Sequence, residues 1–276
     1  MNEADNQRTT EPGALSPTAI KQCCATVYES DAVKLLLGDA LHPGGTEMTE
    51  RLGRMLGLGP RKRVLDVAAG RGTTALTLAT RFGCEVIGLD YSPRNIEEAK
   101  RGASERGLSD KVTFYCGDAE RLPFADASFD AIVCECALCT FPNKASAATE
   151  FARVLRVGGQ VGLSDPTRRG TLPSELQCLA AWIACIADAQ PLTEYGALLA
   201  AAGLRVVATE VHNGALIDFV NQIRTRLLMT EVMVGLNKLS LPGFDIAMVK
   251  DFTRRVLEAI GAGELGYAIL IAAKGG

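Results

Sequence analysis

The chain has 276 residues, of which 47% are hydrophobic and 22% are charged. This composition excludes a fully disordered or collagen-like protein, and the length allows one large domain or two small ones. The formal net charge of −3 argues against a broad electrostatic surface for nucleic acid.

The first part of the chain is predicted to be helical. Residues 1–17 are polar and are expected to be a flexible tail, whereas residues 18–56 have helical patterns with a break at Pro43–Gly45. Gly38 and the Pro43–Gly45 break between these helices suggest that the segment forms a lid. Further on, short apolar runs alternate with amphipathic stretches. They predict strands at 63–69, 84–89, 112–116, 131–136 and 160–164, and helices at 73–82, from Ser92-Pro93 onward, and at 145–156, with Gly158-Gly159 as a helix stop.

The last third adds a helix at 194–202, a strand at 205–210 and a closing strand at 267–273. Between these two strands, residues 215–261 predict a helical insertion that is broken at Pro242-Gly243. Strands that alternate with helices indicate a Rossmann-like, doubly wound, mostly parallel seven-stranded sheet with helices on both faces. We therefore expect residues 57–276 to form one α/β domain behind the helical lid.

A glycine-containing loop follows the first predicted strand. Gly70 and Gly72 allow a tight turn and the close approach of a ligand, and Asp90 ends the second strand twenty residues after Gly70. A carboxylate at that place accepts hydrogen bonds from ribose hydroxyls. Asp66 would repel a pyrophosphate but attract a cationic amino group, and Asp118 can meet an adenine amino group. The pattern lacks the third glycine of a dinucleotide site.

These motifs resemble class I S-adenosyl-L-methionine (SAM)-dependent methyltransferases. The matching pieces are VLDVAAGRG, GLDYS, GDAERLPF, SFDAIVCE and RVLRVGG, within residues 63–165. Ala68 stands where the family usually has a further glycine. The resemblance implies SAM as cofactor and 57–276 as the methyltransferase domain. It implies that Asp66, Gly70 and Gly72 surround the methionine part, Asp90 holds the ribose, and Tyr91, Asp118 and Ala119 contact the adenine.

The chain has nine cysteines, which is an odd number, and we find no export signal in the sequence. Both observations argue against a disulfide scaffold. The N-terminus lacks the apolar core of a signal peptide, and the longest nearly apolar run, 178–187, is about half of a membrane span. We expect a cytoplasmic protein that uses neither membrane nor nucleic acid. Its oligomeric state stays open. Cys84, Cys116 and Cys134 are expected to be buried strand residues.

Cys136 and Cys139 follow the fourth strand, where ligands of open parallel sheets bind. The segment CALCTFPNK, 136–144, resembles the corresponding part of arsenite methyltransferases, as do SD, LPSEL and WIACI downstream. This resemblance implies that Cys136 and Cys185 are catalytic and hold a trivalent arsenical as substrate. Our own hypothesis adds Cys139 or Cys24 as a third ligand, although the family's upstream cysteines have no clear counterpart in this sequence. A thiol reductant is then a possible partner. Soft arsenic favours thiolates, and its lone pair needs no base. Segments 38–45 and 212–276 depart from that family.

Two other functions remain open. The first is a C- or O-methyltransferase of a small metabolite, because the motif GDAERLPFADASFD also occurs in methyltransferases of quinone biosynthesis. The second is a sensor that binds SAM and uses its thiols without catalysing a reaction. O- or N-methylation often uses a base, for which Glu135 and His42 are candidates. Glu135 is expected rather to orient the cofactor or to cap the strand. His212 is expected in a turn, and Trp182 in the core or beside Cys185.

Overall fold

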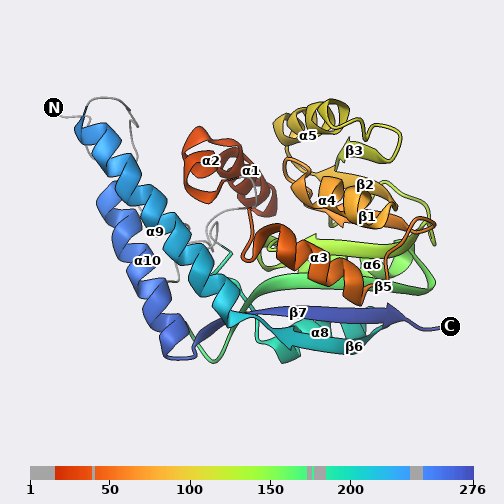
Figure 1. Cartoon of the computed structure of the whole chain (residues 1–276). Helices are drawn as coiled ribbons and strands as arrows, with labels where there is room; N and C mark the ends of the chain where they lie inside the picture. Colours follow the sequence, from red (N-terminus) through yellow and green to blue (C-terminus); the bar gives the residue numbers. More distant parts are fainter. Residues whose placement is uncertain (1–15, 39–40, 173–175, 177–184, 237–244) are drawn as a thin grey trace.

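The structure is a computed structural model that describes residues 16–38, 41–172, 176, 185–236 and 245–276. A seven-stranded sheet runs through its centre in the order β3-β2-β1-β4-β5-β7-β6, with helices on both faces (Figure 1). The strand β7 is antiparallel to both neighbours, and the other pairs are parallel. The strands are β1 Arg63–Val67, β2 Glu85–Asp90, β3 Val112–Cys116, β4 Phe129–Glu135, β5 Leu155–Arg168, β6 Leu204–Val211 and β7 Leu265–Lys274. The Rossmann-like sheet expected from the sequence is confirmed.

Two hydrophobic clusters cover the two faces of this sheet. One contains buried residues of α3, α4, α5, α9 and α10, such as Leu52 and Ile96, and the other contains α6 and α8, with Phe151 and Leu199. The parallel strands are buried on both faces, which explains why they are apolar runs without alternation. The helices are α1 Pro17–Glu29, α2 Asp31–Leu37, α3 Gly45–Met55, α4 Thr73–Phe82, α5 Pro93–Glu105, α6 Lys144–Val154, α8 Leu192–Ala201, α9 Asn213–Gly235 and α10 Ile246–Gly261, with the short 3-10 turn η2 Leu138–Thr140.

Local signals set several of these boundaries. Ser92 caps α5 by accepting a hydrogen bond from the Asn95 amide, 2.9 Å away, with Pro93 in the first turn. Helix α4 begins and ends as predicted, after Gly72 in the left-handed conformation. Helix α3 likewise begins at the predicted Pro-Gly-Gly break.

The expected end of the helix before β5 is wrong. Helix α6 ends at Val154, and Gly158 and Gly159 lie inside β5 instead of stopping the helix. Leu155 is extended and fully buried, so pairing with Phe129 of β4 replaces the last helical turn. Tertiary pairing here overrides the helical periodicity of the sequence.

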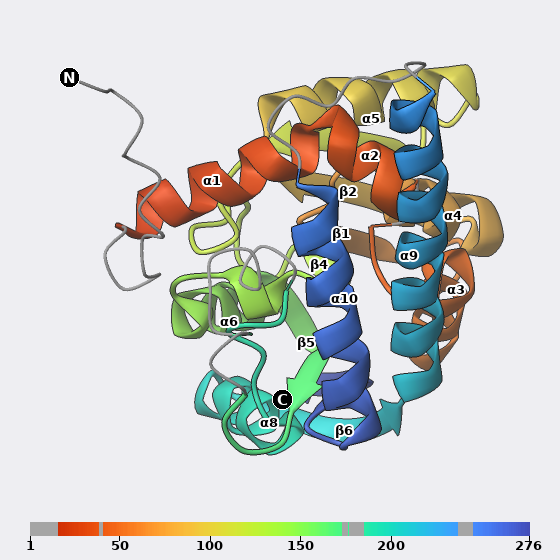
Figure 2. The same cartoon turned by 90° about the vertical axis from the view of Figure 1, so that its left-hand side faces the viewer.

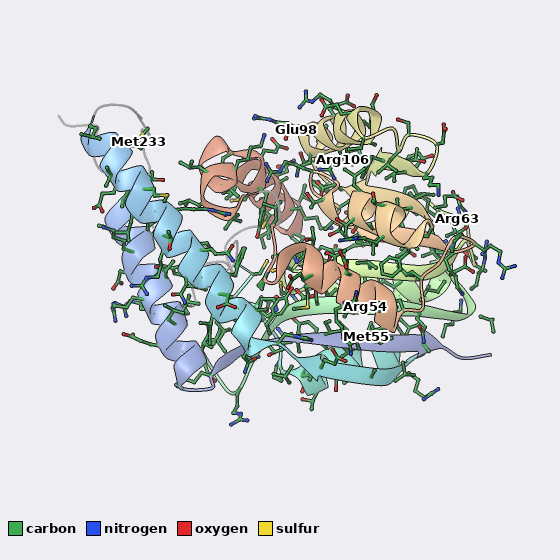
Figure 3. The ribbon with its side chains drawn as sticks, viewed as in Figure 1. Arg54, Met55, Arg63, Glu98, Arg106 and Met233 are labelled. Atoms are coloured by element: carbon green, nitrogen blue, oxygen red, sulfur yellow. The ribbon has the colours of Figure 1, made fainter. Side chains whose placement is uncertain are left out.

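Two further helices pack against one end of the sheet and extend beyond it (Figure 1). Helices α9 and α10 form an antiparallel arm between β6 and β7, and α2 packs beside α9 (Figure 2). Met233, near the far end of α9, stands away from the sheet (Figure 3). The insertion was predicted, whereas its Pro242-Gly243 break and Trp182 lie outside the described residues. Among the described helices, none is long and apolar enough to cross a membrane. The proposed domain boundaries stay predictions.

Candidate active site

The loop between β1 and α4 has an unusual backbone. Gly70 and Gly72 have φ angles of 52° and 83°, and Ala68 has a φ of 58°. A Cβ atom on Gly72 would lie 2.6 Å from the Phe114 ring, so only glycine fits there. Gly70 and Gly72 were expected to surround a ligand. Gly70, together with Ala68, lines a cavity of about 160 Å³ over the ends of the strands, whereas Gly72 is not among the lining residues.

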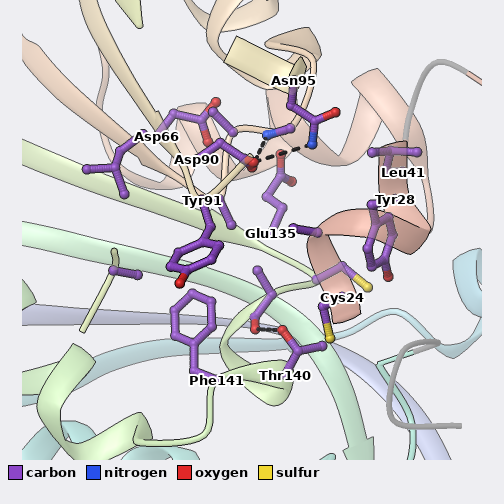
Figure 4. Close-up of a pocket in the computed structure, with 18 of the residues that line it drawn as sticks. Cys24, Tyr28, Leu41, Asp66, Asp90, Tyr91, Asn95, Glu135, Thr140 and Phe141 are labelled. Carbon is purple, nitrogen blue, oxygen red and sulfur yellow. Dashed lines mark hydrogen bonds between the residues drawn. The ribbon is translucent and has the colours of Figure 1, made fainter. Parts of the chain in front are cut away.

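Asp90 holds this loop in place. It ends β2 and is 8% exposed, and its carboxylate accepts hydrogen bonds from the Gly70 amide at 2.8 Å and the Ser92 amide at 2.9 Å. The Asn95 side chain donates a third bond at 3.3 Å (Figure 4). Burial raises the pKa of the Asp90 carboxyl above its usual value, and these hydrogen bonds oppose the shift. Asp90 therefore shapes the loop in addition to facing the cavity.

Asp66 supplies a second carboxylate to the cavity wall. It is 2% exposed, and its Oδ2 atom has no hydrogen-bond partner within the described chain. Burial, followed by the charge of Glu135, raises the pKa of the Asp66 carboxyl well above its usual value. A buried carboxylate oxygen without a partner calls for a donor or a cation. The amino group of a bound SAM molecule fits this requirement.

The other end of the cavity carries Tyr91, Asp118 and Ala119, as expected for an adenine site. Lys21 of α1 reaches the same place. Its ammonium lies 2.8 Å from Asp118 Oδ2 and 2.5 Å from Glu120 Oε2. The first helix of the predicted lid is thus attached to the loop that was expected to contact the adenine.

Glu135 lies at the end of β4 in a network of hydroxyl groups. The hydroxyls of Thr49 and Thr74 each donate to its Oε2 atom at 2.8 Å, and Ser164 Oγ lies 3.3 Å from Oε1. The His42 ring nitrogen Nε2 is 3.5 Å from Oε2. His42 is 6% exposed and lines the cavity, so it is not a solvated loop residue. The network holds Glu135 against the cavity.

The structure brings three cysteines together. The Cys185 thiol, when protonated, donates to the Cys136 carbonyl at 2.9 Å, and the Tyr28 hydroxyl lies 3.5 Å from the same sulfur. Hydrogen bonds from the thiols of Cys136 and Cys139, then from Tyr28, lower the pKa of the Cys185 thiol, and burial opposes this effect. The pKa values of Cys136 and Cys139 are raised in turn. We call Cys136, Cys139 and Cys185 the thiol cluster; it holds one thiolate most readily at Cys185.

Cys24 also faces this region, because it lines the cavity and the charge of Cys185 contributes to its raised pKa of about 12, after burial. Within the described ranges, however, no group of three or more His, Cys, Asp or Glu side chains has the arrangement of a metal site. The thiol cluster is therefore not a preformed tetrahedral site.

Cys134 is fully buried as expected, and Cys84 is buried just before β2. Cys116 is exposed, which corrects its expected burial, because β3 is the edge strand.

A buried acid lies beside the thiol cluster. Asp165 is 3% exposed, and neither of its carboxylate oxygens has a hydrogen-bond partner of ordinary geometry among the described residues. Burial raises the pKa of the Asp165 carboxyl to about 8, although the neighbouring Cys139 opposes the shift. This acid is therefore largely protonated at neutral pH.

A second cavity, of about 490 Å³, adjoins the first. Tyr28, Leu41 and Cys136 line both cavities, so these three residues form the junction between them. The second cavity lies against α2, α9 and α10. Sequence reasoning named the loop of Gly70 and Cys136, which line the first cavity, but it did not name Tyr28, Leu41, Thr49 or Thr74 as site residues. These residues belong to no motif, and only the packing of the N-terminal helices brings them to the site.

His212 precedes α9 and lies 3.2 Å from Glu210, in the turn that was expected.

Residues 64–159 match a sequence family described as "Methyltransferase domain". This segment is therefore similar to methyltransferase domains. It contains the loop, Asp90, Asp118 and Cys136, so the resemblance to methyltransferases expected from the sequence is supported over these residues. Two solved structures with the same fold, at 20% and 19% identity, are methyltransferases in complex with SAM.

Relatives and solved structures agree with this assignment. The methyltransferase GfsG of Streptomyces halstedii is 36% identical over 169 residues, which are 60% of this chain and 61% of GfsG. The 27-O-demethylrifamycin SV methyltransferase of Amycolatopsis mediterranei is 34% identical over 148 residues, 49% of this chain and 54% of that protein. The geranyl diphosphate C-methyltransferase of Streptomyces coelicolor has the same fold, with a TM-score of 0.71 at 18% identity over 92% of this chain and 98% of that one.

The chain spans about three fifths or less of these two curated relatives. None of the three proteins is named as an arsenite methyltransferase, so the arsenite resemblance stays a hypothesis.

Proposed function

We propose that the chain transfers a methyl group from SAM to a small organic molecule. The observation that supports this proposal best is the cavity of Asp66, Gly70 and Asp90, which joins a second, apolar cavity at Tyr28, Leu41 and Cys136. A cofactor and an acceptor held in two adjoining cavities meet at one place, which is what methyl transfer requires.

Each end of the first cavity has a separate task. Bound SAM supplies an electrophilic methyl group on a sulfonium. Asp90 accepts hydrogen bonds from the ribose hydroxyls, Asp66 attracts the amino group, and Asp118 accepts from the adenine. Glu135, held by hydrogen bonds from Thr49 and Thr74, lies on the cavity wall. Helix α1 lines this cavity with Lys21, Cys24 and Tyr28.

The acceptor is proposed to react at carbon or oxygen. The rifamycin relative, whose name specifies an O-methyltransferase substrate, supports an organic acceptor. His42, which faces Glu135 at 3.5 Å, is the nearest candidate for removing a proton from a hydroxyl. A carbon nucleophile that is already electron-rich would not need it for attack.

The proposal is tested by incubating the chain with methyl-labelled SAM and extracts of small molecules, with mass spectrometry of the products. Calorimetry with SAM and S-adenosylhomocysteine runs in parallel. A labelled organic product and micromolar cofactor binding are expected. Binding without any product would instead indicate the SAM-binding sensor.

A second candidate acceptor is a trivalent arsenical. The thiol cluster favours it, because Cys136 and Cys185, with Cys139 close by, offer soft ligands at the junction of the two cavities. Arsenic attacks through its lone pair, so this reaction needs no base. A thiol reductant would then keep the cysteines reduced. Variants that separate the two candidates are described in the Discussion.

A further inference from the structure

The second cavity is built by the insertion and the N-terminal helices. Its walls come from α2, with Leu36 and Leu37, from α9, with Phe219 and Ile223, and from α10, with Val249 and other residues. At about 490 Å³ it is roughly three times the volume of the first cavity. It therefore has room for a molecule with many more atoms than arsenite.

The walls of this cavity are almost entirely apolar. Of the described residues that line it, only Asp251 and Arg255 are charged. These two pair with each other, with Arg255 Nε 2.7 Å from Asp251 Oδ2. Among these described residues, a phosphorylated or ammonium-bearing acceptor would find no charged partner that is not already paired to offset its lost hydration. A neutral hydrocarbon surface would gain from burial.

One end of the cavity is more polar than the rest. The Tyr28 hydroxyl lies at the junction, next to the Cys185 sulfur, and Cys136 faces both cavities. A long acceptor with one polar group has only this end at which to place that group near the cofactor. Its apolar body would then extend toward α9 and α10.

We propose that the cavity between α2, α9 and α10 binds the apolar body of the methyl acceptor, a neutral, hydrocarbon-rich molecule whose reactive group lies at Tyr28 and Cys136. The inference rests on the proposed methyltransferase function and names its substrate class. The helical insertion between β6 and β7 is then the specificity element of the chain.

The experiment measures the fluorescence of N-phenyl-1-naphthylamine, a neutral apolar probe, with S-adenosylhomocysteine present. Ile223→Trp fills the cavity from α9, and Val249→Trp fills it from α10. Val232→Trp is the matched control, because Val232 lies on α9 with 61% exposure and does not line the cavity. We expect the two cavity variants to bind the probe at least tenfold more weakly than the wild type, and the control to bind it equally well.

Two readouts keep this inference separate from the function on which it rests. Calorimetry with S-adenosylhomocysteine should give the same affinity in all three variants, and a wild type that does not bind it would contradict the methyltransferase proposal itself. Equal probe affinity in the wild type and both cavity variants would overturn the cavity assignment alone. A wild type that methylates phosphorylated or ammonium-bearing acceptors in preference to neutral alkylphenols would overturn it as well.

Discussion

Three residues of the site have a left-handed backbone although they are not glycine. Ala68, Cys136 and Cys185 have φ angles of 58°, 51° and 63°. This conformation costs about 1 kcal/mol or more for a residue with a Cβ atom. All three lie at the cofactor loop or in the thiol cluster, so the strain is concentrated where ligands are expected to bind.

Replacing Ala68 with glycine should stabilise the protein. Ala68→Gly removes the left-handed strain, and the greater freedom of glycine in the unfolded chain offsets part of this gain. We expect the free energy of unfolding to rise by up to about 1 kcal/mol in urea denaturation. The control is Ala69→Gly, since Ala69 has no positive φ and should lose stability. A loss of equal size in both variants would contradict the strain at Ala68.

Asp90 is the residue on which cofactor binding should depend most. Because its oxygens also hold the amides of Gly70 and Ser92, an alanine would disturb the loop, and Asp90→Asn is the better variant. It should weaken SAM binding by about 1.5–3 kcal/mol in calorimetry, since a charged acceptor is lost. Glu98→Gln on α5, which pairs with Lys34 and does not line the first cavity, should leave the affinity unchanged. Unaltered binding in Asp90→Asn would reject the ribose assignment.

Asp165 should make stability depend on pH. Its folded pKa of about 8 lies above the ordinary value of 3.8, so the folded protein keeps a proton that the unfolded chain releases between these values. The free energy of unfolding should therefore fall as pH rises from about 4 toward 8. Asp165→Asn resembles the protonated acid and should reduce the slope of this dependence in urea unfolding between about pH 5 and pH 8, while the raised pKa of the Asp66 carboxyl leaves a remaining slope. Asp130→Asn should keep the wild-type slope, because the pKa of Asp130 is lowered and its titration lies below this range.

At the scale of elements, helix α1 connects the predicted lid to the cofactor site. Lys21 pairs with Asp118 and Glu120, and the buried Ile20 anchors the helix. A second ion pair joins Lys34 of α2 to Glu98 of α5, with 2.6 Å between Lys34 Nζ and Glu98 Oε1. Neither residue lines the first cavity. The two pairs permit a matched comparison of the lid's attachment points.

With Lys21→Met, helix α1 should detach from the first cavity more often than with Lys34→Met. We expect faster hydrogen exchange in residues 17–29 and faster dissociation of S-adenosylhomocysteine, because the ion pair holds the helix over the bound cofactor. In the wild type, cofactor binding should protect the same residues. Identical exchange with and without S-adenosylhomocysteine would speak against a lid.

At the scale of the whole molecule, the thiol cluster decides between the two acceptors. If it holds an arsenical, Cys136→Ser and Cys185→Ser each replace a soft ligand with a hard one, and arsenite methylation should be lost in both. If the acceptor is organic, both variants should retain most of their activity on it. SAM binding should change little in either case, because neither residue lies in the loop of Gly70 and serine, which is close to cysteine in size, leaves the lining at Cys136 nearly unchanged.

The controls for this comparison use two other cysteines. Cys84→Ser should lower stability, because Cys84 is fully buried, and exposed Cys116→Ser should change neither stability nor activity. The readouts are arsenical and organic products in mass spectrometry. A wild type without an arsenical product, or full arsenite methylation in the double serine variant, would end the arsenic hypothesis.

The sequence by itself determined the sheet, most element boundaries and the cofactor loop. These features depend on local signals such as apolar runs, the Ser92 cap and the spacing between Gly70 and Asp90. Only the tertiary structure decided that α6 ends at Val154 and that the edge residue Cys116 is exposed, because strand pairing is not local. It also decided the acceptor side: Tyr28 meets Cys185 across 157 residues of sequence, and the apolar cavity exists because α2 and α10 both pack beside α9. Contacts between such distant segments leave no periodic or spacing signal in the chain.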